Sequence, residues 1–185
     1  MIATRFLAKQ DYALYGNWLR EQSVETLASY FGAVVSDSYI DTLVDSIVAH
    51  PERHHFLVAY LGATWVGTIH LAHISDQDME FGIMVHPDHR GEGFANELMD
   101  EAIIWIRNRG FNHLYLHCLN RNSAMKHLAQ KHGLIMHAEG GDVDADIMLP
   151  PPSILTYTQE ALNFQKNIFF LNLKQSWFPF TELHG

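Results

Sequence analysis

The stretch VHPDHRGEGFA, residues 85–95, decides the fold. It follows the alternating segment EFGIMVH, which is typical of a strand, and it precedes an apolar repeat of helical period from Phe94 to Arg109. The two glycines of the turn lack side chains, so backbone N–H groups can approach a ligand closely at the positive end of the helix. Arg90 adds a fixed positive charge and donors that suit a phosphate. We therefore predict an anion-binding turn.

Two known phosphate-binding sequence patterns are missing from this turn, which limits the kinds of anion that it could bind. The pattern G-x-x-x-x-G-K-[ST], which binds nucleoside triphosphates, is absent from the sequence. The dinucleotide pattern G-x-G-x-x-G fails because Asn96 occupies its third glycine position. A glycine-rich turn without a ligand is the simpler alternative. The preceding strand, Pro87, Arg90 and the amphipathic helix together favour a phosphate-type ligand over it.

The pattern along the rest of the chain predicts one α/β domain. Period-two stretches predict strands at residues 4–8, 55–60, 64–73, 80–86, 113–119, 134–139 and 144–149. Apolar repeats of period 3.6 predict helices that start near Asp11, Ser23, Ser36, Phe94 and Asn122. Three prolines at residues 150–152 end this pattern. We expect residues 1–150 to form the domain, and residues 151–185 to form an extension with a helix at 158–173 and an aromatic end.

The segment RGEGFA resembles the [QR]-x-x-G-x-[GA] signature of the GCN5-related N-acetyltransferases, the GNAT family. Upstream, EFGIMV resembles the fourth strand of that family. Downstream, NRNSAMKHLAQKHGL resembles the helix that follows its fifth strand. The order of elements fits the family from about Thr4 to Leu149. The resemblance implies an α/β fold with a mixed, largely antiparallel central sheet flanked by helices.

The same resemblance implies transfer of an acetyl group from acetyl-CoA to a primary amine, which attacks the thioester directly. In this family the pyrophosphate binds the turn, and the pantetheine arm pairs with the fourth strand. A backbone N–H near Met84 or Val85 would then contact the thioester carbonyl and stabilise the oxyanion. The residues expected to bind acetyl-CoA are Ile83, Met84, Val85, Arg90, Gly91, Glu92, Gly93, Phe94, Ala95 and Asn122.

Glu80 is the candidate catalytic base. A free lysine has a pKa near ~10.4, so a base must remove its proton before it attacks at neutral pH. Glu80 lies on the expected fourth strand, at a position where many family members carry glutamate. Its four-residue separation from Met84 spans roughly 13 Å. Glu80 would therefore act through a water molecule or bind the positive charge of the substrate. The simpler alternative to both roles is that Glu80 is an exposed strand carboxylate without a function.

One position departs from the family. Many members carry a tyrosine, thought to protonate the leaving thiolate, where this chain has Ala129. Ser123, His127 or Cys118 could replace it, or no donor is needed because a thiol has a pKa near ~8.5. The departure leaves open a non-catalytic sensor that binds CoA or acyl-CoA. A protein-interaction module that has lost the ligand is a further alternative, against which the intact RGEGFA motif argues. The pattern N-S-A-M-x-x-L-A is similar to that of some bacterial protein-lysine acetyltransferases.

Composition limits the partners. Lys and Arg total 12 against 21 Asp and Glu, and the net charge of −9 argues against nucleic-acid or anionic-membrane binding. It mildly favours a cationic substrate, so the expected acceptor is an amine-bearing small molecule or a protein amine. The single cysteine excludes an internal disulfide, and no apolar stretch near the N-terminus resembles a signal peptide. We therefore expect a cytoplasmic protein.

The 13 histidines raise the question of a metal site. None of their clusters has the H-E-x-x-H spacing. His113 and His117 share one strand face but lie roughly 13 Å apart, too far to bind one ion. We expect no metal.

Aromatic residues fall in two regions of interest. Tyr30 and Tyr39 flank the expected acceptor side and are better candidates for its wall than Trp65 or Trp18, which lies on an apolar helical stripe. The aromatic residues of the tail should pack on the domain or on another subunit, which suggests a homodimer. They are Trp177, Phe178 and Phe180.

Overall fold

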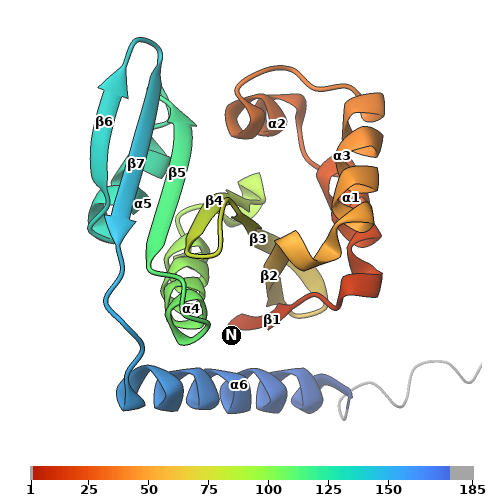
Figure 1. Ribbon diagram of the computed structural model, residues 1–185. Coiled ribbons are helices and arrows are strands. Elements are labelled where there is room, and N and C mark those ends of the chain that lie inside the picture. Colours follow the sequence, from red (N-terminus) through yellow and green to blue (C-terminus); the bar gives the residue numbers. More distant parts are fainter. Residues whose placement is uncertain (1, 176–185) are drawn as a thin grey trace, which may run out of the picture.

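A seven-stranded sheet organises the chain in the computed structural model, which describes residues 2–175. The strands are β1 (Ile2–Phe6), β2 (His54–Leu61), β3 (Thr64–His73), β4 (Asp78–Val85), β5 (His113–Leu119), β6 (Ile135–Glu139) and β7 (Asp142–Met148). Their order is β1-β2-β3-β4-β5-β7-β6, and every neighbouring pair is antiparallel except β4 and β5. The expected mixed, largely antiparallel sheet is therefore confirmed (Figure 1).

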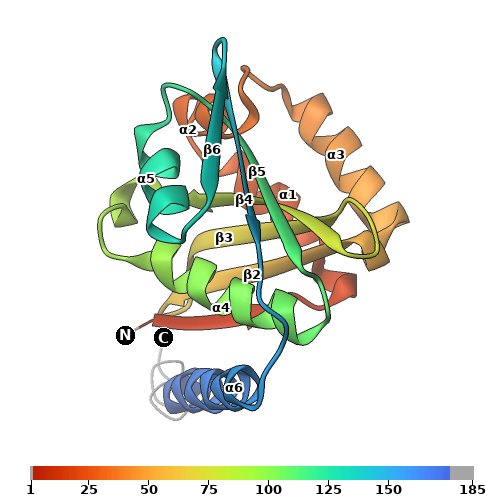
Figure 2. The ribbon, with the colours of Figure 1, turned by 60° about the vertical axis from the view of Figure 1, so that its left-hand side comes forward.

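Helices cover both faces of this sheet. They are α1 (Ala13–Arg20), α2 (Val24–Phe31), α3 (Asp37–Ala49), α4 (Phe94–Asn108), α5 (Ser123–Lys131) and α6 (Ile154–Gln175). Figures 1 and 2 show α1, α2 and α3 on one face, α4 and α5 on the other, and α6 beside β1. Ser23 and Ser36 begin α2 and α3, because their side-chain oxygens accept hydrogen bonds from the first turn of each helix.

The alternation along β4 places its side chains in two separate cores. Phe81 and Ile83 pack in the core shared with α4 and α5, whereas Met84 packs in the core shared with α1 and α3. Burying such a side chain stabilises the fold by about 1.5–3 kcal/mol relative to leaving it exposed. Because both faces of β4 are covered from Phe81 to Met84, the backbone of this part of the strand can meet a ligand only at its edges.

One edge of β4 is free over most of its length. Its other edge pairs with β3 from Met79 to Val85. Toward β5, the pairing covers only residues 78–80 opposite 113–115. Beyond Glu80 the two strands diverge, while β5 stays paired with β7 on its other edge from His113 to Leu119. The sheet therefore has a gap between β4 and β5 that opens toward the carboxyl ends of both strands.

Helix α6 begins earlier than the sequence pattern indicated. The expected start was Thr158, but the helix begins at Ile154. Ser153 and Thr156 cap it reciprocally, since each backbone N–H donates to the other's hydroxyl oxygen, at 2.9 and 3.3 Å. Such a cap satisfies backbone donors at the start of a helix, so it extends α6 by one turn.

Polar side chains hold α6 on the domain. Asn167 is buried, accepts a hydrogen bond from the Thr4 backbone N–H at 3.0 Å, and donates to the Thr4 hydroxyl at 2.7 Å. Glu101 of α4 accepts from both Thr4 and Asn167. Burial raises the pKa of Glu101, against the opposing effect of the Thr4 hydrogen bond. Ion pairs join Lys166 to Glu97 and Arg109 to Glu160.

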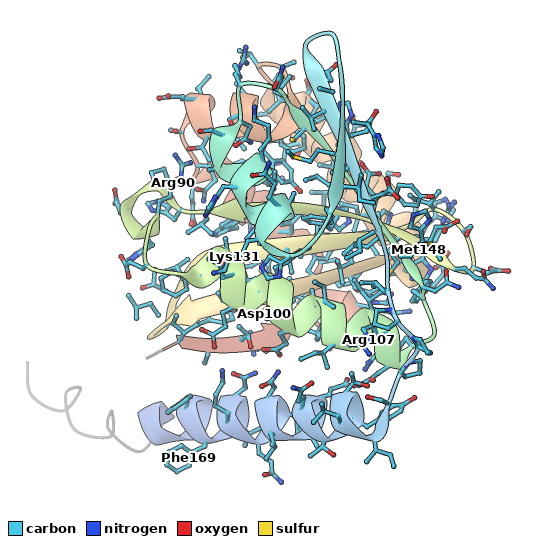
Figure 3. All side chains as sticks on the ribbon, turned by 90° about the vertical axis from the view of Figure 1, so that its left-hand side faces the viewer. Arg90, Asp100, Arg107, Lys131, Met148 and Phe169 are labelled. Atoms are coloured by element: carbon cyan, nitrogen blue, oxygen red, sulfur yellow. The ribbon has the colours of Figure 1, made fainter. Side chains whose placement is uncertain are left out.

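The opposite face of α6 is apolar and exposed. Its large side chains are Ile154, Leu155, Leu162, Ile168 and Phe169; Figure 3 shows Phe169 pointing away from the domain. A surface helix ordinarily buries its apolar face. Helix α6 does the opposite: it contacts the domain through polar side chains and exposes apolar ones. The predicted packing of Trp177, Phe178 and Phe180 lies outside the described residues, and the division at residue 150 stays a prediction. Within residues 2–175, no helix is long and apolar enough to cross a bilayer.

Replacing Asn167 with Ala should destabilise the fold by about 1–3 kcal/mol, because the Thr4 N–H and Glu101 lose a buried partner. Urea unfolding measures this change. The matched control is Gln165→Ala on the exposed face of the same helix, which should change the free energy of unfolding by less than about 0.5 kcal/mol. Equal effects of the two substitutions would contradict a polar docking of α6.

Candidate active site

The glycine turn leaves open space at the start of α4. Gly91 and Gly93 have φ angles of 81° and 91°, in the left-handed region that favours glycine. A Cβ atom added to either residue would meet nothing within 4 Å. No side chain caps the first turn of α4, so its N–H groups face that open space. The predicted turn is thus a cradle of backbone donors, of a kind that binds anions.

Arg90 connects this cradle to two other elements. Its Nε donates to the Val85 carbonyl at the end of β4 at 3.3 Å, and its Nη2 donates to the Thr26 hydroxyl of α2 at 2.9 Å. Thr26 is buried. The guanidinium is therefore held beside the turn instead of moving freely in solvent. Next to it, Glu92 pairs with His89 at 3.3 Å.

The predicted cofactor residues lie around the gap between β4 and β5. Ile83, Met84 and Phe94 bury their side chains in the cores, so each could contact a ligand only through its backbone. Asn122 begins α5, just after β5, and its Oδ1 accepts a hydrogen bond from the Met125 N–H at 3.1 Å. The amide NH2 group of Asn122 is not used in that cap and could donate to a ligand.

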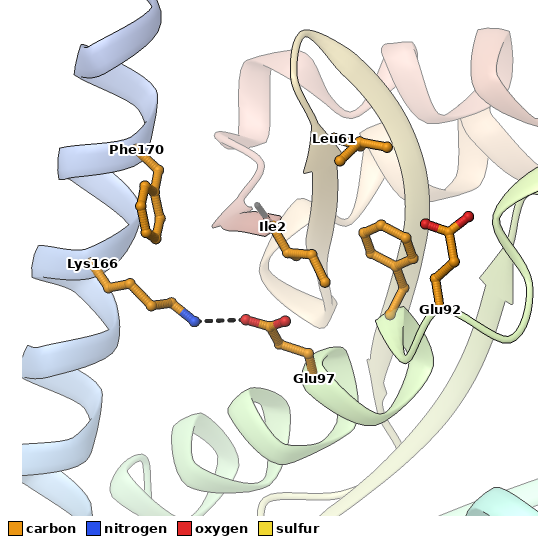
Figure 4. Close-up of a pocket in the computed structure, with 7 residues that line it drawn as sticks. Ile2, Leu61, Glu92, Glu97, Lys166 and Phe170 are labelled. Atoms are coloured by element: carbon orange, nitrogen blue, oxygen red, sulfur yellow. Dashed lines mark hydrogen bonds and ion pairs between the residues drawn. The ribbon is translucent and has the colours of Figure 1, made fainter.

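The cavity drawn in Figure 4 is a different place. It measures about 450 Å³ and lies between α6 and the first turn of α4. Its charged lining consists of Glu92, Glu97 and Lys166, and Lys166 is already paired with Glu97 at 2.6 Å. Two carboxylates with one paired ammonium do not suit an anion. We therefore place the site at the gap and not in this cavity.

Glu80 stands where β4 and β5 diverge. It is exposed, and it is the last residue of β4 that pairs with β5, opposite Tyr115. Its side chain is on the same face of β4 as Met84, which is the face covered by α1, α2 and α3. This position lets the carboxylate face whatever binds over the gap.

Tyr30 of α2 reaches over the same strand. A Cβ added to Gly82 would overlap the Tyr30 hydroxyl, so only glycine at this position leaves room for that side chain. The Tyr15 hydroxyl donates to the Tyr30 oxygen at 3.5 Å. Burial, with a smaller contribution from the charge of Glu80, raises the pKa of Tyr30 to about 12. The far end of α2 reaches β5, since a Cβ on Gly32 would lie 3.7 Å from Leu119.

The other aromatic candidates have different surroundings. Trp18 is buried and stacks on Trp65 with ring centroids 5.3 Å apart, so it belongs to the core as expected. Tyr39 is 47% exposed and meets Phe31 edge to face. Of the four aromatic residues considered from the sequence, Tyr30 is therefore the one that reaches β4 at the gap.

Acidic and histidine side chains line β5 and β7 on the face that carries Glu80. His113 contacts Asp146 at 2.9 Å, and His117 contacts Asp144 at 2.7 Å. The His113 hydrogen bond lowers the pKa of Asp146, and the Asp144 hydrogen bond raises that of His117. Together with Glu80, the two aspartates place three carboxylates on this face. The paired histidines offset part of the charge of the aspartates, so the face suits a cationic ligand mainly through Glu80.

The remaining histidine clusters are pairs between β2 and β3. His54 contacts His70, and His55 contacts His73, each at 3.0 Å. Burial is the main cause that lowers the pKa of His70 to about 3 and that of His55 to about 4. Both rings are therefore neutral at physiological pH. Among residues 2–175, no three His, Cys, Asp or Glu side chains gather closely enough to hold a metal ion.

The position of the family tyrosine lies in the core. Ala129 is fully buried, among residues of α4 and β5. Of the substitutes considered, Ser123 and His127 are exposed on α5, whereas Cys118 is buried, and burial raises the pKa of its thiol. Cys118 also faces the core that contains Phe81, opposite to the face of Glu80.

Comparison with known proteins settles the family. The sequence profile described as Acetyltransferase (GNAT) family matches residues 18–134, more than half of the chain. The chain belongs to the GNAT family. The expectation from RGEGFA is therefore confirmed, whereas a comparison with curated proteins gave no match.

Solved structures of GNAT proteins share this fold at low identity. The GNAT domain of S. lividans PAT is 20% identical with a TM-score of 0.67, over 79% of this chain and 89% of that one. The yncA protein of Salmonella typhimurium, solved with its cofactor acetyl-CoA, is 17% identical with a TM-score of 0.62, over 83% and 98%. Spermidine N-acetyltransferase from Vibrio cholerae, solved with CoA and spermine, is 21% identical with a TM-score of 0.62, over 80% and 95%.

Sequence reasoning missed two contacts of this site. The first joins Arg90 to Thr26, and nothing in the sequence pattern around Thr26 indicates it. The second joins Tyr30 to Gly82. An isolated glycine inside a strand often marks the close approach of another group, so Gly82 was a signal for it.

Proposed function

We propose that this GNAT protein transfers the acetyl group of acetyl-CoA to a primary amine. The observation that carries the proposal is the continuity of two free surfaces: the glycine cradle of residues 90–95 leads directly to the unpaired edge of β4. The cradle suits a pyrophosphate, and the strand edge suits an extended chain with amide groups, such as pantetheine. The residues proposed to hold acetyl-CoA are Ile83, Met84, Val85, Arg90, Gly91, Glu92, Gly93, Phe94, Ala95 and Asn122.

The proposed mechanism is direct attack of the bound amine on the thioester. Acetyl-CoA supplies an activated acetyl group when it is bound. A backbone N–H near Met84 or Val85 donates to the carbonyl oxygen and stabilises the negative charge that develops there. Glu80 accepts the proton of the amine, which a neutral nucleophile must lose.

The proposed acceptor is a cationic small amine or the amine of a basic protein segment. Glu80, Asp144 and Asp146 place three carboxylates on one face beside the gap, and the whole chain carries a net charge of −9. Among the similar structures, a spermidine N-acetyltransferase was solved with CoA and spermine. These observations support an amine acceptor, and the small-molecule and protein alternatives both stay within the proposal. We also propose that the protein is cytoplasmic, as the sequence predicts.

Replacing Gly93 with Val should abolish acetyl-CoA binding, because it strains a left-handed backbone and fills the open cradle. Thermal unfolding with and without acetyl-CoA measures this. Acetyl-CoA at about 100 times its Kd should stabilise the unmodified protein by roughly 2.7 kcal/mol. Gly110→Val is the matched control, since Gly110 has a similar φ of 84° and equally open surroundings beyond α4.

The two variants should lose similar stability without ligand, but only Gly110→Val should keep the stabilisation by acetyl-CoA. If both keep it, the cradle is not the binding site. If acetyl-CoA and CoA fail to stabilise even the unmodified protein, the function proposed here is wrong and the interaction-module alternative gains support.

Replacing Glu80 with Gln should lower the rate of acetyl transfer by about 100-fold or more, as loss of a general base does. The assay follows CoA release with spermidine and with a lysine-containing peptide as acceptors. Stabilisation by acetyl-CoA should be unchanged in this variant. Glu25→Gln, at an exposed position of α2, is the control and should react at the original rate. An unchanged pH–rate profile in Glu80→Gln would remove Glu80 as the base, and binding without any transfer would favour the acyl-CoA sensor.

We also propose that the chain forms a homodimer through α6. The polar residues of α6 are engaged by its own domain, which leaves an apolar face uncovered. Among the side chains of α6 that the structure describes, two are charged, Glu160 and Lys166. Both form ion pairs within the same chain, with Arg109 and Glu97 respectively. A second copy can therefore meet this face without repulsion between like charges.

Replacing Leu162 with Glu should make the protein monomeric, because it places a charge in the apolar contact. Light scattering coupled to gel filtration should give twice the chain mass of 21.2 kDa for the unmodified protein and that mass itself for the variant. Leu14→Glu, at an apolar position on α1 that is 46% exposed, is the control and should stay dimeric. A monomeric mass for the unmodified protein would contradict the dimer.

A further inference from the structure

The proposed base is too far from the proposed point of attack. Glu80 and Met84 are four residues apart on an extended strand, which spans roughly 13 Å. An amine positioned to attack a carbonyl at the Met84 or Val85 N–H would therefore not touch the Glu80 carboxylate. A general base acts only within hydrogen-bond reach of the proton or through an intervening group. Some group between the two must carry the proton.

The Tyr30 hydroxyl occupies the position between them. Residues 80, 82 and 84 alternate onto one face of β4, so Gly82 lies midway between Glu80 and Met84. The Tyr30 hydroxyl packs against the Cα atom of Gly82, where any other residue would place its Cβ. The side chain nearest to the middle of this span is thus brought in from α2, and it ends in a hydroxyl group.

The hydrogen bonding of Tyr30 leaves its proton available. Tyr15 is buried and donates to the Tyr30 oxygen. That bond uses one lone pair of Tyr30, and it leaves the second lone pair and the proton. Among the described residues, no group accepts the Tyr30 proton. The hydroxyl can therefore accept a proton from one side and donate its own to the other.

The surroundings of Tyr30 keep it neutral. Burial and the nearby charge of Glu80 raise its pKa to about 12, despite the opposing effect of the Tyr15 hydrogen bond. His70, in register with Gly82 on β3, is also neutral because burial lowers its pKa to about 3. Tyr39 contributes a smaller effect in the same direction as Glu80. Tyr30 therefore cannot serve as a standing base, but it can pass a proton on.

We propose that the Tyr30 hydroxyl carries a proton from the acceptor amine to Glu80, an inference that rests on the function proposed above. One N–H bond of the amine breaks as a new O–H bond forms at Tyr30. The original O–H bond of Tyr30 breaks, and its proton passes to the Glu80 carboxylate directly or through one water. The nitrogen lone pair then forms the C–N bond, and the C–S bond electrons leave with the thiolate. The amide nitrogen releases its second proton to solvent, from which the thiolate can take one up. Tyr30 ends neutral and Glu80 ends protonated.

The cofactor cradle positions the helix that carries this hydroxyl. Thr26 and Tyr30 lie one turn apart on α2, and Thr26 accepts the hydrogen bond of Arg90. At the other end of α2, Gly32 lies against Leu119 of β5. The helix is therefore fixed to the cradle and to both sides of the gap, which holds the hydroxyl over Gly82.

The test compares Tyr30→Phe with Tyr60→Phe from pH 7 to 9.5. Tyr60, on β2, bonds Arg5 outside the site and serves as the matched control. The assay measures acetyl transfer to spermidine and to the N-terminal and lysine amines of a test peptide. At pH 7, Tyr30→Phe should react about 100-fold more slowly than the unmodified protein. Its rate on the lysine amine should then rise about tenfold per pH unit, because without the relay only the neutral amine can attack, whereas its rate on the N-terminal amine, with a pKa of about 8, should level off above pH 8. The deficit should thus shrink with pH, whereas a purely structural defect would not.

Stabilisation by acetyl-CoA separates the outcomes. Tyr30→Phe should keep this stabilisation, and Gly82→Ala, which displaces the hydroxyl without removing it, should show the same pH-dependent deficit. The losses of these two variants should not add when they are combined, because both interrupt one relay. Full activity of Tyr30→Phe at pH 7, or a deficit independent of pH, would overturn the relay and leave the proposed function standing. Failure of the unmodified protein to acetylate any of these amines would overturn both.

Discussion

The parting of β4 from β5 is the constraint on which the rest of the site depends. Each of these strands is anchored on its outer edge, β4 by β3 and β5 by β7, so the gap does not unravel the sheet. The free edge of β4 still carries backbone groups that require hydrogen-bond partners. A ligand with amide groups can satisfy them, and the glycine cradle at the end of the same strand can hold that ligand's phosphates. Strand edge and helix start thus form one continuous binding surface.

Helix α2 connects the separate parts of this candidate site. It contacts the cradle through Thr26, the middle of β4 through Tyr30, and the end of β5 through Gly32. These three contacts lie along less than two turns of helix, so few residues are needed to fix them. Because Arg90 and Gly82 both contact α2, a displacement of Arg90 would also shift the Tyr30 hydroxyl. The cradle and the acceptor side are mechanically connected, although they lie on different elements.

Local patterns of the sequence predicted what depends on local physics. The alternation of EFGIMV placed Phe81 and Met84 on opposite faces, and the glycines indicated an open turn before α4. Contacts between distant residues were not predictable in this way. The sequence indicated Tyr30 as a candidate for the wall of the acceptor side, but its partner Gly82 is on a strand far along the chain, and nothing near Tyr30 pointed to it. Asn167 and Thr4 lie 163 residues apart, so nothing near either indicated that α6 docks through polar groups.

The acceptor amine and the thiol of CoA differ in acidity. This difference explains why a single hydroxyl group is of most use where the amine is deprotonated. At pH 7, removing the proton of an amine with a pKa near ~10.4 costs roughly 4.6 kcal/mol. A thiolate with a pKa near ~8.5 takes up a proton spontaneously at that pH, so solvent can complete the departure of CoA. Ala129 removes the usual donor to the thiolate, which is the less demanding transfer. The hydroxyl of Tyr30 over Gly82 is the group that we propose for the more demanding one. The alanine at residue 129 and the proposed role of Tyr30 are therefore consistent with one mechanism, in which deprotonation of the amine is the step that needs assistance.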